Sequence, residues 1–156
     1  MADHPQVHIE LGDRQADVDE GIAPLIMELW KAEIDTVMSC QDNNGHVWVQ
    51  FASAPDAEDF LDIVAGDYDE DVFSLYNRVT GEYEDDDWET FRAEHAWSYD
   101  CAPMDYNAAL VDEDGEVEVP GPERAIVLHI SVRFPHYDYD DVLARLRAHN
   151  AAADIG

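Results

Sequence analysis

The chain has 156 residues, of which 46% are hydrophobic and 10% aromatic, and its 37 Asp and Glu against 8 Lys and Arg give a formal charge of -29. This apolar content is sufficient for a buried core, so the composition excludes a disordered acidic tail. The charge repels phosphate backbones and anionic lipid headgroups, which excludes direct binding of nucleic acid or of a membrane surface.

The cysteines and the hydrophobic pattern indicate a cytoplasmic protein. Cys40 and Cys101 are the only two cysteines, which is too few for a disulfide scaffold. The first residues lack the basic and apolar regions of a signal peptide, and no apolar run reaches the length of a membrane span.

The first part of the chain predicts a strand and then a helix. Val7 to Leu11 alternates between apolar and polar residues, as a half-buried strand does. Asp17 or Asp19 is then expected to cap a helix that ends near Glu33, because apolar residues recur there at helical spacing. Pro24 would lie too far inside this helix, so an irregular first turn is expected.

A hairpin and a second helix follow. Thr36–Cys40 and His46–Phe51 are predicted strands on either side of Asn43-Asn44-Gly45, whose residues tolerate the positive φ of a tight turn. Ser53, with Asp56 three residues later, predicts the N-cap of a helix that ends at Gly66.

Residues 67–96 are interpreted as an acidic helical insertion. A short helix is expected to end near Gly81, and Asp85 to Asp87 would cap another one. An interpretation without a binding role is a solvated pair of helices. Its acidic residues would lie at helix N-termini, where the helix dipole favours negative charge.

The last third predicts strands and a final helix. Trp97–Ala102 and Arg124–Phe134 read as strands, Asp114-Gly115 as a hairpin turn between two more, and Asp138 or Tyr139 as the start of the last helix. Strands joined mostly by hairpins predict a single α+β domain over residues 1–156, with a mostly antiparallel sheet and helices packed on one face.

No metal site and no catalytic site is predicted. Cys40, His46, His95 and Cys101 could supply a Cys2His2 set, but the spacing of five residues within each pair does not suit a compact zinc site. A calcium loop that opened at Asp67 would require Gly at position 72 and Glu at 78, where Val72 and Arg78 stand. No cofactor is expected, and a noncatalytic protein is favoured over an enzyme.

Clusters of acidic residues predict a surface that binds a basic region of another protein. A rigid array of carboxylates can occupy a groove that holds nucleic acid, so a nucleic-acid-binding protein is one candidate partner and inhibition by nucleic-acid mimicry one candidate role. Interleaved aromatic residues would add contact area. The residues expected to contact the partner are Asp67, Asp69, Asp71, Asp85, Asp86, Asp87, Trp88, Glu116 and Glu118.

One segment resembles a known pattern. Gly21-Ile22, Leu25-Ile26, Leu29-Trp30, Thr36 and Ser39-Cys40-Gln41 resemble a motif of small uncharacterised proteins from high-GC bacteria and their phages. The resemblance covers about a fifth of the chain and implies no role for any residue. An origin in a mobile element would favour an inhibitor.

An alternative interpretation remains open. A GC-rich genome or a salty cytoplasm would produce the same acidity in an ordinary globular domain. Such a domain would have a small-ligand or enzymatic role near Cys40 and His46.

Overall fold

The computed structural model describes residues 4–71, 73–80, 95–105 and 126–155. Its strands are β1 (Gln6–Leu11), β2 (Arg14–Asp19), β3 (Thr36–Asn43), β4 (His46–Phe51), β5 (Ser98–Asp105) and β6 (Ile126–Pro135). Its helices are α1 (Ala23–Lys31), α2 (Ala54–Ala65), α3 (Leu75–Thr80) and α6 (Tyr139–Ile155), and short 3-10 turns occupy Glu20–Ile22 and His136–Asp138.

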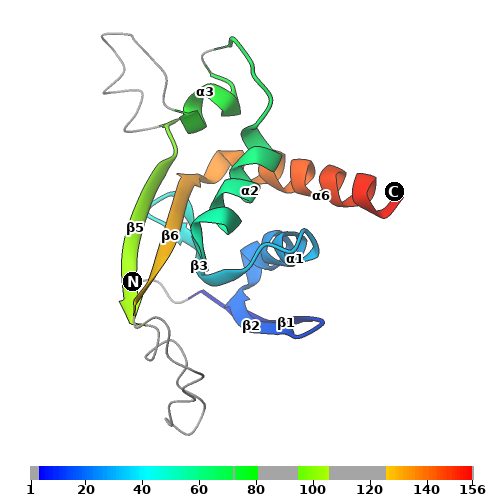
Figure 1. Cartoon of the computed structure of the whole chain (residues 1–156), viewed down its shortest axis with the longest axis vertical. Helices are drawn as coiled ribbons and strands as arrows, with labels where there is room; N and C mark the ends of the chain where they lie inside the picture. Colours follow the sequence, from blue (N-terminus) through cyan, green and yellow to red (C-terminus); the bar gives the residue numbers. More distant parts are fainter. Residues whose placement is uncertain (1–3, 72, 81–94, 106–125, 156) are drawn as a thin grey trace, which may run out of the picture.

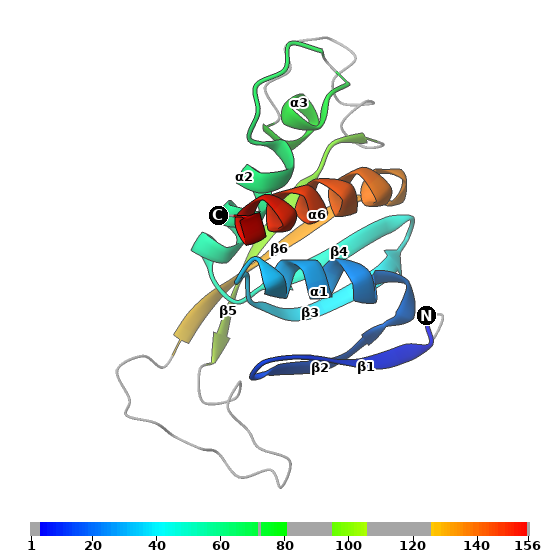
Figure 2. The ribbon, with the colours of Figure 1, turned by 90° about the vertical axis from the view of Figure 1, so that its right-hand side faces the viewer.

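The main sheet has four strands in the order β3-β4-β6-β5, and every neighbouring pair is antiparallel. Two β-β-α units, β3-β4-α2 and β5-β6-α6, therefore meet through their second strands. Strands β1 and β2 form a separate antiparallel hairpin beside α1 (Figure 2).

Helices α1, α2 and α6 cover one face of this sheet (Figure 1). Val47, Val49 and Phe51 of β4 and Val132 and Phe134 of β6 are buried beneath them, because alternate residues of a strand point to the same side. The predicted fold class, α+β with a mostly antiparallel sheet and helices on one face, is confirmed.

The predicted start of the first helix is wrong. Residues Arg14–Asp19, which include both predicted capping residues, form β2, and α1 begins only at Ala23. Gly12 at φ 59° turns the chain back, so that Asp19 pairs with Gln6 across the hairpin. Pro24 consequently lies in the first turn of α1, where a missing N–H costs nothing.

The local signals around the β3–β4 hairpin and α2 are confirmed. Asn44 and Gly45 have φ values of 56° and 84° in the turn. The Ser53 hydroxyl caps α2 by accepting from the Asp56 N–H at 3.3 Å, and it donates to the Asp56 carboxylate at 2.6 Å. These contacts fix the direction in which α2 leaves the sheet.

Two predictions lie outside the described residues: the second helix of the insertion, after Gly81, and the hairpin at Asp114-Gly115. The short helix expected before Gly81 is present as α3. None of the described helices is both long enough and apolar enough to cross a membrane.

Candidate functional site

A surface groove of about 510 Å³ lies between α2, α3 and the β5–β6 edge of the sheet. Its floor is apolar and comes from Ala57 and Leu61 of α2, Val79 of α3 and Ile130 of β6. Glu58 and Asp62 of α2 also line it and add two carboxylates. The groove can therefore bind a ligand that has one apolar face and one positively charged face. The apolar face would contact the floor, and the charged face would contact Glu58 and Asp62.

The acidic loop, defined here as residues 67–71, leaves α2 beyond Gly66 at the end of this groove. Asp69 accepts the N–H of Asp71 at 2.9 Å, and Asp71 accepts the N–H of Phe73 at 2.9 Å. The Asn77 side-chain amide of α3 donates to the backbone carbonyls of Asp69 and Asp71 at 2.9 and 2.7 Å. These hydrogen bonds connect the loop to its own polar groups and to α3.

Exposed aromatic side chains accompany these carboxylates. Tyr68 is 76% exposed and Phe73 is 63% exposed. The Tyr68 ring meets Tyr76 of α3 edge-on, with a centroid distance of 5.3 Å, and Tyr76 in turn lines the groove. Aromatic surface therefore continues from the groove onto the acidic loop, as in binding surfaces that use rigid aromatic anchors.

The structure brings together part of the predicted contact set. Asp67, Asp69 and Asp71 lie in the acidic loop, and all three are exposed. The remaining predicted contacts, Asp85, Asp86, Asp87, Trp88, Glu116 and Glu118, lie outside the described residues. The groove itself was not predicted, because its lining combines residues of α2, α3, β5 and β6 that no local pattern connects.

Several of the few Lys and Arg side chains form ion pairs with carboxylates of the same chain. Arg78 pairs with Asp138, Arg14 with Asp35, Arg145 with Asp141 and Lys31 with Glu28. None of these cations lies opposite the carboxylates of the acidic loop in an ion pair. Within the described segments, these ion pairs therefore leave the carboxylates of the acidic loop without a Lys or Arg partner.

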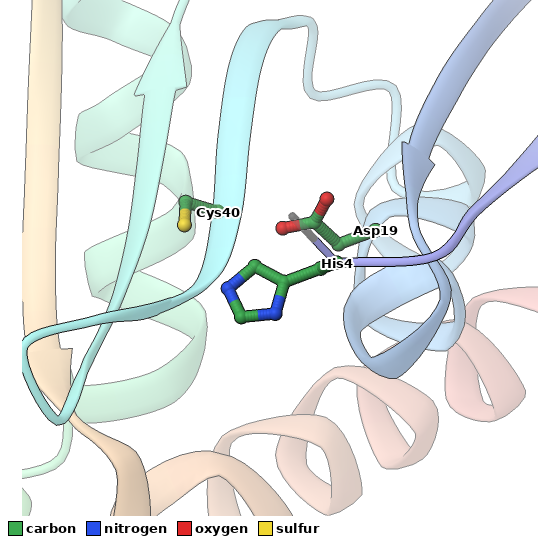
Figure 3. Close-up of side chains that lie close together, drawn as sticks. All are labelled: His4, Asp19 and Cys40. Carbon is green, nitrogen blue, oxygen red and sulfur yellow. The ribbon is translucent and has the colours of Figure 1, made fainter. Parts of the chain in front are cut away.

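Cys40, His46, His95 and Cys101 do not converge on one site, and His95 Nδ1 lies beside the Tyr137 hydroxyl oxygen instead. Cys40 lies on β3 and Cys101 on β5, at opposite edges of the sheet. The cross-strand partner of Cys40 is Trp48, while His46 Nδ1 lies 3.2 Å from the Asn44 carbonyl oxygen in the turn. The structure instead places His4 and Asp19 next to Cys40 (Figure 3). Sequence reasoning missed both, because it assigned Asp19 to a helix cap.

The sheet face turned away from the helices contains buried polar groups. Gln50 pairs with Ser131 across β4 and β6, and both project to this face together with His129. Gln50 is 7% exposed and His129 is 6% exposed. Gln50 Oε1 and His129 Nδ1 have no hydrogen-bond partner within the part of the chain that the structure describes. An unpaired buried acceptor of this kind costs about 1–3 kcal/mol.

Replacement of Gln50 by Met is expected to raise the free energy of unfolding by about 1 kcal/mol, because an unbranched apolar side chain removes the unpaired acceptor at little change in volume. Urea unfolding followed by circular dichroism measures the change. The matched control is Gln15→Met on the exposed side of β2, which is expected to change stability by less than about 0.5 kcal/mol. A loss of stability in Gln50→Met would mean that the amide makes a favourable contact.

Comparison with known proteins returns no relative: no protein-family model matches the chain, and no curated protein or solved structure shows significant similarity to it. A function for the groove and the acidic loop must therefore follow from their own geometry and charge.

Proposed function

We propose that this chain is a noncatalytic, acidic interaction protein of the cytoplasm that binds a basic surface of another protein. The observation that carries the proposal is the apolar groove with carboxylates on its lining, which continues into the ordered acidic loop. A partner segment with one apolar side and one side rich in Lys and Arg fits both parts. The two free cysteines, Cys40 and Cys101, suit a reducing compartment.

The proposed mechanism separates attraction from anchoring. The formal charge of -29 accelerates the approach of a basic partner, and this contribution weakens as salt screens it. The groove floor and the exposed rings of Tyr68 and Phe73 supply contacts that salt does not screen. The most specific version of this proposal is that the partner is a nucleic-acid-binding protein. Its basic groove would bind the acidic loop in place of phosphates.

We expect neutralisation of the acidic loop to weaken binding of a basic amphipathic helix by at least tenfold at low salt, because three charge pairs are lost together. The variant is Asp67→Asn with Asp69→Asn and Asp71→Asn, since Asn keeps the oxygen acceptors that hold the loop. The probe is a synthetic helix with a leucine face and an arginine face. Isothermal titration calorimetry at several salt concentrations measures its affinity.

The control variant removes the same charge elsewhere, through Glu20→Gln, Asp140→Asn and Asp154→Asn, all at exposed positions. A scrambled peptide of the same composition controls for bulk attraction. If both variants lose affinity equally, or if the scrambled peptide binds as well, general charge rather than this surface is responsible. Competition between a duplex DNA and the chain for a DNA-binding protein then tests nucleic-acid mimicry.

A further inference from the structure

Three potential metal ligands from separate segments meet at the edge of the sheet. His4 precedes β1, Asp19 ends β2 and Cys40 lies on β3. One ligand atom from each side chain lies within 4.8 Å of the other two. Figure 3 shows the His4 imidazole and the Asp19 carboxylate beside β3, from which the Cys40 thiol extends.

We propose that His4, Asp19 and Cys40 bind a divalent transition-metal ion, with Zn²⁺ as the ion that the donor set favours. Imidazole nitrogen, carboxylate oxygen and thiolate sulfur are the three ligand types that zinc accepts, and the thiolate disfavours Mg²⁺ and Ca²⁺. Ligand bonds of roughly 2.0–2.3 Å in a tetrahedron place donor atoms roughly 3.5 Å apart. Contraction of the cluster by about 1 Å or less therefore brings the three donors to zinc-binding distance, and a water molecule would fill the fourth position.

The burial of Asp19 is an independent reason to expect a cation here. Asp19 is only 6% exposed, yet within the described segments no Lys or Arg forms an ion pair with its carboxylate. A buried carboxylate without a positive partner is costly. A metal ion bound between Asp19 and Cys40 supplies that positive charge.

The surroundings of Asp19 already orient it as a ligand. Its Oδ2 accepts the backbone N–H of Gln41 at 3.0 Å, and its Oδ1 lies 3.5 Å from the Gln6 side-chain nitrogen. Hydrogen bonds to a ligating carboxylate fix its rotamer before the metal arrives. Since Gln41 directly follows Cys40, the same peptide positions the thiol and the carboxylate together.

The Gln41 side chain controls the third ligand. Its Oε1 accepts the Gly21 N–H at 2.6 Å, and its Nε2 lies 3.4 Å from His4 Nδ1. A Cβ at position 21 would clash with Oε1, so a larger residue there would displace the Gln41 side chain from this contact. With Oε1 facing Gly21, the amide nitrogen that faces Nδ1 can only donate, which favours the His4 tautomer with its proton on Nε2.

Coordination through His4 Nε2 would move this proton to Nδ1, where the Gln41 amide offers a second donor rather than an acceptor. The metal therefore has to displace a long, weak contact, and this lowers affinity. Gln41→Glu keeps the acceptor for Gly21 and supplies a carboxylate for Nδ1–H, the arrangement typical of zinc-bound histidine. We expect this variant to bind Zn²⁺ at least tenfold more tightly than the parent.

Titration with Co²⁺, a spectroscopic substitute for Zn²⁺, tests the site directly. We expect one equivalent to produce a thiolate-to-cobalt charge-transfer band, which Zn²⁺ then abolishes. Cys40→Ser should remove the band, and His4→Ala and Asp19→Asn should each weaken Zn²⁺ binding at least tenfold in competition with a chelator. Cys101→Ser and His136→Ala, at exposed positions away from the cluster, should change neither. A missing band in the parent chain, or a band that survives Cys40→Ser, overturns the proposal.

The unmodified chain provides a second test if a variant fails to fold. Iodoacetamide alkylates Cys40 and Cys101 at rates that mass spectrometry resolves for each peptide, and a coordinated thiolate reacts slowly. Zn²⁺ should slow alkylation of Cys40 at least tenfold and leave Cys101 unaffected. Equal rates with and without Zn²⁺ at Cys40 refute metal binding there. This outcome leaves the groove proposal untouched, because Cys40 does not line the groove.

Discussion

Asp138→Asn is expected to lower the free energy of unfolding by about 3–5 kcal/mol, because it leaves the buried guanidinium of Arg78 without a negatively charged partner. Arg78 Nη2 donates to Asp138 Oδ1 at 2.8 Å, and both side chains are buried. The Trp97 indole N–H donates to Asp138 Oδ2 at 3.0 Å. One carboxylate thus ties α3 and the start of β5 to the turn before α6, and urea unfolding followed by circular dichroism measures its loss.

The matched control is Asp141→Asn, which breaks an exposed pair instead. Arg145 Nε lies 3.3 Å from Asp141 Oδ1 on the surface of α6, at a spacing of four residues. Exposed pairs of this type contribute about 0.3–0.5 kcal/mol. Equal effects from the two substitutions would show that the Arg78–Asp138 pair is solvated and contributes little.

Phe60→Ala is expected to lower the free energy of unfolding by about 3–5 kcal/mol, through lost burial and the cavity left behind. The Phe60 side chain of α2 is fully buried, with ring centroids 5.2 Å from Phe51 and 6.0 Å from Trp97. Trp97 stacks in turn on Phe134 at 4.7 Å. This aromatic cluster joins α2 to β4, to β6 and to the residue that precedes β5, so the cavity cannot collapse without moving the sheet.

Phe73→Ala separates stability from binding. Phe73 is 63% exposed next to the acidic loop, so its truncation is expected to lower the free energy of unfolding much less than that of the fully buried Phe60. The same variant should weaken binding of the basic amphipathic helix, since the ring is a proposed anchor. A stability loss as large as that of Phe60→Ala would contradict the surface role.

The fold was predictable where local chemistry and packing agree. The turn at Asn44-Gly45, the cap at Ser53 and the alternation along β6 each specify an element without reference to distant residues. Strand β2 was missed because Asp17 and Asp19 are typical helix N-cap residues, and neither marks a strand on its own. Only its pairing with β1 decides between the two.

The candidate sites were less accessible to sequence reasoning. The acidity of Asp67, Asp69 and Asp71 is evident locally, but the apolar groove beside them exists only when α2 packs across β6. His4, Asp19 and Cys40 are separated by strands and turns, and the hairpin that carries Asp19 was itself misassigned. A short motif could not have identified a ligand set spread over three segments.

The strand order β3-β4-β6-β5 has a consequence for synthesis on the ribosome. Strand β4 pairs with β6 across the centre of the sheet, and α6, the last element, completes the contacts of α1 and α2 through Asn150 and Arg145. The first hairpins and helices therefore emerge with an unpaired strand edge and an uncovered apolar face. Because the chain has a formal charge of -29, mutual repulsion between nascent chains is expected to slow their aggregation until β6 and α6 have emerged.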